Sequence, residues 1–220
     1  MTELPVFYER NLPHIQPPGA TLFLTYRLVD SIPAYVLREI QAEAQLAARL
    51  VAQLPDTRKS AETANRERIR LFGKWDAALD SAATGPQWLK DPQAAKTVTD
   101  SLHFLDGGTI DIDSFCIMFN HVHVIFTPRM DPKTGEYHAL RKIMQSHKGY
   151  TARKCNQLLQ RKGQFWQHES FDHYVRDTAE LDRIRRYVIL NPVRAGLVEN
   201  WDEWPWTYRK FVASCFPACA

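Results

Sequence analysis

The sequence lacks long hydrophobic runs, a leader segment and a nucleotide-binding loop. No stretch approaches the run of about 20 apolar residues that a membrane-spanning helix needs. Residues 1–5 have neither the basic nor the apolar region of a signal peptide, so we expect a cytoplasmic protein with no membrane partner. A G-x-x-x-x-G-K-[ST] phosphate loop is also missing, so the sequence gives no sign of a nucleotide cofactor.

Cysteine is scarce and irregularly spaced. Of the four cysteines, Cys116 and Cys155 are isolated, and only Cys215 and Cys219 lie near each other. This spacing is poor evidence for a disulfide framework or a four-cysteine zinc site. We therefore expect free thiols.

Length and composition predict one folded domain. The 220 residues are 45% hydrophobic and 24% charged, as in ordinary globular proteins. The net charge is only +3, but residues 138–220 contain 14 Lys and Arg against 8 Asp and Glu, whereas the preceding residues contain 14 against 17. The basic C-terminal part suits a polyanion such as nucleic acid, although basic surfaces are also common on proteins that bind none.

The hydrophobic patterns predict an α+β fold with helices on an antiparallel sheet. Strands are expected at 21–28, 109–118, 121–127 and 165–168, and helices at 33–54, 60–72, 92–105, 137–161 and 177–190. The second and third strands should form a hairpin about Phe119–Asn120. We read residues 1–220 as one domain with a helical insertion at 33–105 and an aromatic tail at 201–220.

Two histidines share one face of a predicted strand. His121 and His123 are separated by one residue, so both imidazoles project from the same face about 6–7 Å apart, while Val122 and Val124 take the other face. Two neutral imidazoles in this position can converge on one divalent ion. The alternative is a polar pair on the solvated face of an amphipathic strand.

A tyrosine and an asparagine lie one turn apart at the end of the last predicted helix. Tyr187 and Asn191 share a face while the chain stays helical, although Pro192 disfavours the helical conformation at Asn191. A tyrosine can act as a covalent nucleophile if a positioned electrophile and positive charge are near. Arg183, Arg186 or Arg194 could supply that charge, and the alternative for Tyr187 is a packing role.

Other constellations are weaker. Tyr150 and Tyr174 are rival nucleophiles, but neither has an amide-bearing residue four positions later. His168, Glu169 and His173 differ from H-E-x-x-H by one extra residue, which excludes a shared helical face for a zinc site of that type.

A set of motifs along the chain resembles one known family. The segment 115–123 places His-x-His after a short Met-x-Asn, and it is followed in order by segments at 146–153, 165–177, 187–198 and 204–206, with a further match at 11–21. This ordered set is similar to the REP-associated tyrosine transposases, a branch of the IS200-like HUH single-tyrosine transposases. Phe119 stands where the family usually has proline, and the 33–105 segment is longer than compact members need.

The resemblance implies a fold and a reaction. The fold would be a ferredoxin-like sheet with the two histidines on a central strand and the tyrosine on a helix packed beside it. His121, His123 and Asn191 would hold a divalent metal, Mg²⁺ or Mn²⁺, and Tyr187 would attack a single-stranded DNA phosphodiester. The products would be a 5′-phosphotyrosine and a free 3′-hydroxyl, which can be rejoined in strand transfer.

The expected partner is single-stranded or hairpin DNA resembling a REP element. Basic residues that could contact phosphates are Arg141, Lys142, Lys148, Arg153, Lys154, Arg183, Arg186 and Arg194. Two alternatives stay open, a domesticated hairpin-binding module without cleavage and a metal-dependent phosphodiesterase that uses water. The sequence also leaves open whether the protein is a monomer or a homodimer.

Overall fold

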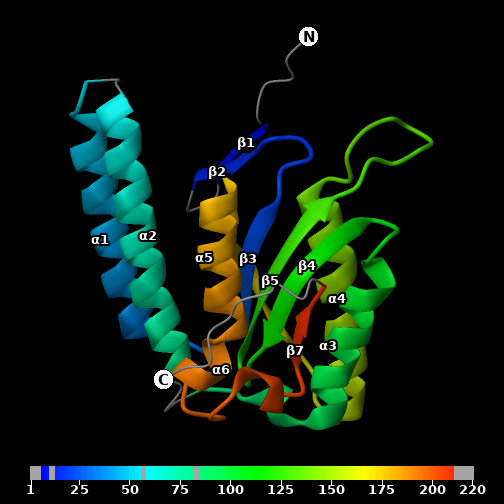
Figure 1. Ribbon diagram of the computed structural model, residues 1–220. Helices are drawn as coiled ribbons and strands as arrows, with labels where there is room; N and C mark the ends of the chain where they lie inside the picture. Colours follow the sequence, from blue (N-terminus) through cyan, green and yellow to red (C-terminus); the bar gives the residue numbers. More distant parts are fainter. Residues whose placement is uncertain (1–5, 10–12, 56–57, 82–84, 211–220) are drawn as a thin grey trace.

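The centre of the molecule is a five-stranded antiparallel sheet in the order β6-β3-β5-β4-β7 (Figure 1). The structure is a computed structural model that describes residues 6–9, 13–55, 58–81 and 85–210. The strands are β3 (Leu22–Leu28), β4 (Ile110–Ile117), β5 (His121–Pro128), β6 (Trp166–Tyr174) and β7 (Thr207–Arg209). Strand β5 is the middle strand, so its residues can be enclosed from both faces.

Helices cover the two faces of the sheet unequally. Helices α3 (Pro92–Leu105) and α4 (Leu140–Leu158) pack on one face, where Val98 and Ile143 join Val124 and other alternate strand residues in the larger core. Helix α5 (Thr178–Ile189) packs on the opposite face, where Val188 contacts a smaller core that includes Ile125. The short helix α6 (Asn191–Arg194) follows.

The order β3-α3-β4-β5-α4-β6 and the pairing of these four strands are ferredoxin-like, as the family resemblance implies. The predicted hairpin is present, because β4 pairs with β5 and the chain turns between Met118 and His121. Strand β7 adds a fifth strand beyond β4. Strands β1 (Val6–Glu9) and β2 (Pro13–Gln16) pair with each other in a separate two-stranded sheet. Short 3-10 helices lie at Trp88–Lys90 and Trp201–Glu203.

Two long helices are inserted between β3 and α3. Helices α1 (Ala34–Ala52) and α2 (Arg58–Asp80) lie side by side next to α5 (Figure 1). Glu43 of α1 accepts from Arg70 and Lys74 of α2 at 2.8 and 2.6 Å on their exposed surfaces. We call α1 and α2 together the α1–α2 hairpin. The C-terminal end of α2 reaches the turn between β4 and β5. Leu79 is fully buried there, and its carbonyl accepts from Asn120 Nδ2 at 3.0 Å.

The predicted elements differ from the structure mainly in their ends. Asp91 caps α3 as its sequence position indicates, since Oδ1 accepts from the backbone N–H groups of Gln93 and Ala94 at 2.8 and 3.0 Å. Helix α2 continues eight residues beyond the predicted end at residue 72, and β6 continues six residues beyond the predicted end at residue 168. Both extensions are stabilised by long-range packing rather than by local pattern.

The C-terminal aromatic residues pack back on the sheet. Trp204 joins the smaller core and its Nε1 donates to the carbonyl of Ile117 at 2.9 Å, while the Tyr208 ring stacks on Phe115. Residues 211–220, including Cys215 and Cys219, lie outside the described residues. Cys116 and Cys155 are buried free thiols. No helix in the described part of the chain has both the length and the hydropathy needed to cross a membrane.

Candidate active site

The two histidines lie on the α5 side of the central strand. In the antiparallel register, His123 faces Thr25 of β3 and Cys116 of β4, and His121 faces Arg27 of β3. Both imidazoles are almost completely buried, and their Nε2 atoms are 3.0 Å apart. The alternative of a solvated polar strand face is therefore excluded.

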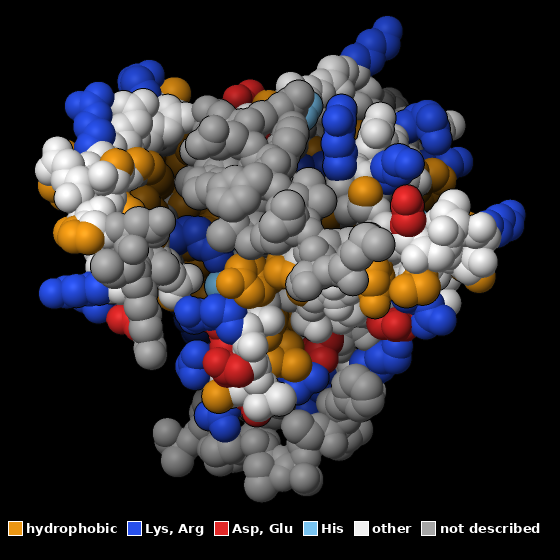
Figure 2. Space-filling view, turned by 90° about the horizontal axis from the view of Figure 1, so that it is seen from above, with side chains coloured by type: hydrophobic (Ala, Val, Ile, Leu, Met, Phe, Trp, Pro, Cys, Tyr) orange, Lys and Arg blue, Asp and Glu red, His pale blue; other side chains and the backbone are white. Residues whose placement is uncertain are grey.

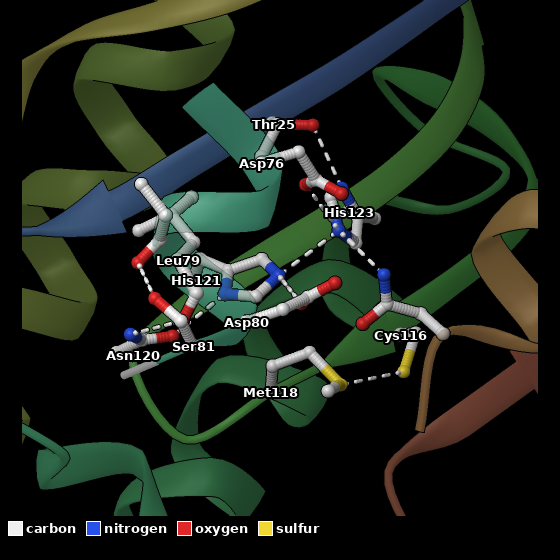
Figure 3. Close-up of polar contacts among 12 residues, drawn as sticks. Thr25, Asp76, Leu79, Asp80, Ser81, Cys116, Met118, Asn120, His121 and His123 are labelled. Carbon is white, nitrogen blue, oxygen red and sulfur yellow. Dashed lines mark hydrogen bonds and ion pairs between the residues drawn. The ribbon is translucent and has the colours of Figure 1, made fainter. Parts of the chain in front are cut away.

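Contacts around the two imidazoles determine which ring nitrogen of His121 carries hydrogen. Asn120 donates through Nδ2 to the carbonyl of Leu79, so its Oδ1 is the acceptor for His121 Nδ1 at 2.7 Å (Figure 3). Thr25 Oγ1 lies 2.7 Å from His123 Nδ1 on the other side. With hydrogen on Nδ1, the Nε2 atom of His121 presents a lone pair to the centre of the site, as a metal-ligating histidine does.

The end of α5 brings Tyr187 and Asn191 to the same place. Helix α5 ends at Ile189, and the chain resumes as α6 with Pro192 in its first turn, where a missing N–H is tolerated. In this arrangement Asn191 Nδ2 lies 3.3 Å from His123 Nε2. The Tyr187 and His123 ring centroids are 5.3 Å apart.

Two carboxylates reach the same place from α2, and the sequence analysis did not identify them. Asp76 Oδ1 is 3.4 Å from His123 Nε2, and Asp80 Oδ1 is 3.9 Å from His121 Nε2 (Figure 3). The hydroxyl of Tyr187 donates to the other carboxylate oxygen of Asp76. The four-residue spacing of the two aspartates was the available signal, because it places them on one face of a helix.

Burial controls the charge of these groups. It lowers the pKa of both His121 and His123 to about 3, so both imidazoles are neutral at neutral pH. Burial, together with the neighbouring Asp76 carboxylate, raises the pKa of Asp80 to about 7. Burial also raises the pKa of Asp76, and burial followed by the Asp76 charge raises the pKa of the Tyr187 hydroxyl above its usual value.

The donor atoms of the site suit a divalent cation. One ligand atom from each of Asp76, His121 and His123 lies within 4.8 Å of the others. Among the described residues, Asp76 Oδ1, Asp80 Oδ1 and Asn191 Oδ1 are buried without a hydrogen-bond partner. Buried acceptors without donors are costly, and a cation would satisfy them.

The predicted basic residues fall into three groups. Arg141, Lys142, Arg153 and Lys154 are exposed on α4, which packs on the sheet face opposite to the histidines. Arg183, Arg186 and Arg194 are exposed on α5 and α6, and the Arg194 guanidinium lies 4.8 Å from the Tyr187 ring centroid. Figure 2 shows Lys and Arg side chains at several places around the face seen from above.

Lys148 behaves differently from the other cations of α4. Its Nζ donates to the carbonyl of Gln167 at 3.1 Å and to Ser170 Oγ at 2.7 Å, both on β6. Burial lowers the pKa of this amine to about 7. Lys148 therefore holds α4 against β6.

The rival residues lie away from the histidines. Tyr150 is exposed on α4, and Tyr174 is half-buried at the end of β6. His168, Glu169 and His173 all lie on strand β6, so they do not form a helical zinc motif. His173 Nε2 instead contacts Glu180 at 3.0 Å.

Comparison with known proteins agrees with the fold and with the motifs. Residues 93–191 match a family described as transposase IS200 like, and this region includes both histidines, Tyr187 and Asn191. The resemblance to the IS200-like transposases is confirmed. The match ends before the aromatic segment and begins after the α1–α2 hairpin.

Two relatives extend the comparison. A Haemophilus influenzae protein named as a candidate REP-associated tyrosine transposase is 25% identical over 114 residues, which cover 47% of this chain and 62% of the relative. The chain thus matches about three fifths of that relative's length. A solved structure of a REP-associated tyrosine transposase bound to a REP hairpin has a TM-score of 0.50 and 16% identity, covering 91% of this chain and 80% of the other. That likeness supports the fold.

The raised pKa of Asp80 predicts a pH-dependent effect of Asp80→Asn in metal-free protein. Between its ordinary pKa of 3.8 and its folded pKa of about 7, the Asp80 carboxyl keeps a proton in the folded state that it loses in the unfolded state, so the contribution of Asp80 to wild-type stability falls as pH rises through this window. Asn does not titrate. In urea unfolding with a chelator, the variant should gain at least about 1 kcal/mol over wild type on going from pH 4 to pH 8.

The matched control for this experiment is Asp100→Asn on α3. The Asp100 carboxylate is exposed and accepts from Lys96 at 2.6 Å. Its effect should change little over the same pH range. A pH-independent effect of Asp80→Asn would contradict the buried, desolvated environment assigned to Asp80.

Proposed function

We propose that the chain cleaves and rejoins single-stranded DNA through a covalent bond to Tyr187. The observation that supports this most directly is the meeting of Tyr187 from α5, Asn191 from α6 and the two histidines from β5, His121 and His123, at one buried place. The IS200-like family match spans all four residues. A packing role for Tyr187 would not require these polar neighbours.

The site is proposed to hold Mg²⁺ or Mn²⁺ through His121, His123 and Asn191. Both imidazoles are neutral, and Asn191 has an amide oxygen without a hydrogen-bond partner among the described residues. When bound, such a cation polarises a phosphoryl oxygen and makes the phosphorus more electrophilic. The nitrogen ligands would also admit Zn²⁺.

Tyr187 is proposed as the nucleophile. Its phenolic oxygen forms a bond to phosphorus while the bond from phosphorus to the 3′ oxygen breaks, giving a 5′-phosphotyrosine. The proton given up by the phenol is balanced by the proton gained on the freed 3′-hydroxyl. The Arg194 guanidinium over the Tyr187 ring would stabilise the negative charge that develops during attack. Because the covalent bond keeps the phosphodiester energy, rejoining needs no nucleotide.

Hairpin DNA is proposed as the substrate. One structural relative is solved with a REP hairpin, and the exposed cations on two sides of this chain suit phosphate contacts. The residues proposed to contact DNA are Arg141, Lys142, Arg153, Lys154, Arg183, Arg186 and Arg194. Lys148 is left out of this set, because its amine is engaged with β6.

The variant Tyr187→Phe tests the nucleophile. It keeps the ring packing and removes only the hydroxyl, so the fold and the DNA affinity should change little while the covalent adduct disappears. Wild-type protein incubated with single-stranded hairpin DNA and Mn²⁺ should give a covalent protein–DNA band on a denaturing gel. Tyr150→Phe, which alters an exposed tyrosine on α4, is the matched control and should keep the band.

Other outcomes would point to different functions. An adduct that persists in Tyr187→Phe and maps to Tyr150 or Tyr174 would show that the nucleophile is another tyrosine. Cleavage without any adduct would favour a phosphodiesterase that uses water. Hairpin binding without cleavage, in wild-type protein with Mn²⁺, would favour a binding module.

Salt dependence tests the proposed DNA contacts on α4. Lys and Arg that bind phosphates displace counterions, so the slope of log affinity against log salt reflects their number. Changing Arg153 and Lys154 together to Gln should flatten this slope by somewhat less than about two units. The control pair is Arg70→Gln with Lys74→Gln on the α1–α2 hairpin, where both cations are paired with Glu43. An unchanged slope for the α4 pair would place the DNA on another surface.

A further inference from the structure

The α1–α2 hairpin is attached to the site by one face of α2. Residues at positions 68, 72, 76 and 80 recur every four positions, so they share one side of this helix. Each one contacts the sheet or α5. Arg68 lies over the Phe171 ring and contacts His173, both on β6.

Phe72 continues this contact toward the nucleophile. Its ring stacks on Phe171 with centroids 4.2 Å apart. The same ring meets Phe23 edge to face at 5.6 Å and Tyr187 at 5.9 Å. Aromatic contacts of this kind orient rings as well as bury area. Helix α2 is therefore packed against the reacting end of α5, and it positions the two aspartates that follow.

Asp76 faces the histidine nitrogens with one carboxylate oxygen, Oδ1. The side chain is only 3% exposed, and Oδ1 has no hydrogen-bond partner among the described residues. Asn191 Nδ2 and His121 Nε2 both approach His123 Nε2, at 3.3 and 3.0 Å. If Asn191 donates there, His123 Nε2 carries a lone pair, as His121 Nε2 does. Asp76 Oδ1 and the Nε2 atoms of both histidines then converge as electron-pair donors in a buried place, and a bound cation would satisfy all three.

We infer that α2 completes the metal centre, with Asp76 as a ligand of the same divalent cation as His121 and His123. This inference rests on the proposed function, in which those histidines bind metal. Asp76 Oδ1 bonds to the cation, while its other oxygen continues to accept from the Tyr187 hydroxyl. The carboxylate thus links the cation to the nucleophile and to the α1–α2 hairpin.

A carboxylate changes which cations the site prefers. Two imidazoles and an amide form a neutral set that suits Zn²⁺ at least as well as Mn²⁺. An added anionic oxygen favours the harder cations, Mn²⁺ and Mg²⁺, and Asp80 beside His121 adds further negative charge. The selectivity for Mn²⁺ therefore depends on the α1–α2 hairpin, which lies outside the region of family similarity.

Calorimetric titration of the metal-free full-length protein with Mn²⁺ tests the inference, because it needs no DNA and no activity. Asp76→Asn keeps the size of the side chain and an acceptor for Tyr187 but removes the anionic ligand. We expect its Kd for Mn²⁺ to be at least about tenfold weaker than in wild type, with a smaller loss for Zn²⁺. The rise in Tm on adding Mn²⁺ should shrink in parallel.

The matched control is Glu67→Gln on the same helix. Glu67 accepts from Arg70 on the surface of α2, so Mn²⁺ affinity should stay at the wild-type value. Circular dichroism and the Tm without metal show whether each variant folds. If Asp76→Asn fails to fold, Asp76→Glu keeps the carboxylate and should retain Mn²⁺ binding, and loss of binding in that folded variant would overturn the inference.

The outcomes separate this inference from the proposed function. Wild-type Mn²⁺ affinity in folded Asp76→Asn, combined with loss in His121→Ala and His123→Ala, would overturn the role of Asp76 and leave the histidine metal site standing. Unchanged affinity in all three variants would overturn both. Loss in all three, with Glu67→Gln unaffected, is the result we expect.

Discussion

The arrangement of the site depends on one constraint, which is the burial of His121 and His123 on the middle strand of the sheet. Alternation along β5 sends Val122 and Val124 into the larger core, so His121 and His123 must point to the other face. That face is also covered, and the imidazoles are buried. Purely apolar neighbours would leave their ring nitrogens without partners, at a cost of about 1–3 kcal/mol each. The elements that cover this face must therefore bring polar groups.

Each covering element meets this requirement in its own way. Strand β3 brings Thr25 to one ring, and the β4–β5 turn brings Asn120 to the other. Helix α5 brings a phenol, α6 brings an amide, and α2 brings carboxylates. Apolar and aromatic residues such as Phe23 and Val188 fill the space around these groups. The polar contacts orient the side chains, and the packed rings bury them.

The sequence predicts the parts of this site that follow from local periodicity. Alternation places both histidines on one face, and the four-residue spacing places Asn191 below Tyr187, even though Pro192 argued for a break. Asn191 still lies near His123 because a new helix, α6, begins at Asn191 with Pro192 in its first turn. Leu190 is the single residue between α5 and α6. The extension of helix α2 to Asp80 and the burial of its two aspartates could not be predicted in the same way. The helical pattern predicts an end at residue 72, and aspartates on a highly charged helix are typical of a solvated face. Their burial depends on docking of the α1–α2 hairpin, which is a long-range contact that leaves no local pattern.

The central claim is that α2, β5 and α5 meet around one divalent cation beside the nucleophile. Anomalous diffraction at the manganese edge, from crystals of the full-length protein soaked in Mn²⁺, tests it most directly. We predict a single strong peak within bonding distance of the Nε2 atoms of His121 and His123 and of an Asp76 oxygen. A peak that contacts the histidines without Asp76 would contradict the part assigned to α2. Absence of a peak at the histidines, with Mn²⁺ bound elsewhere on the chain, would contradict the account as a whole.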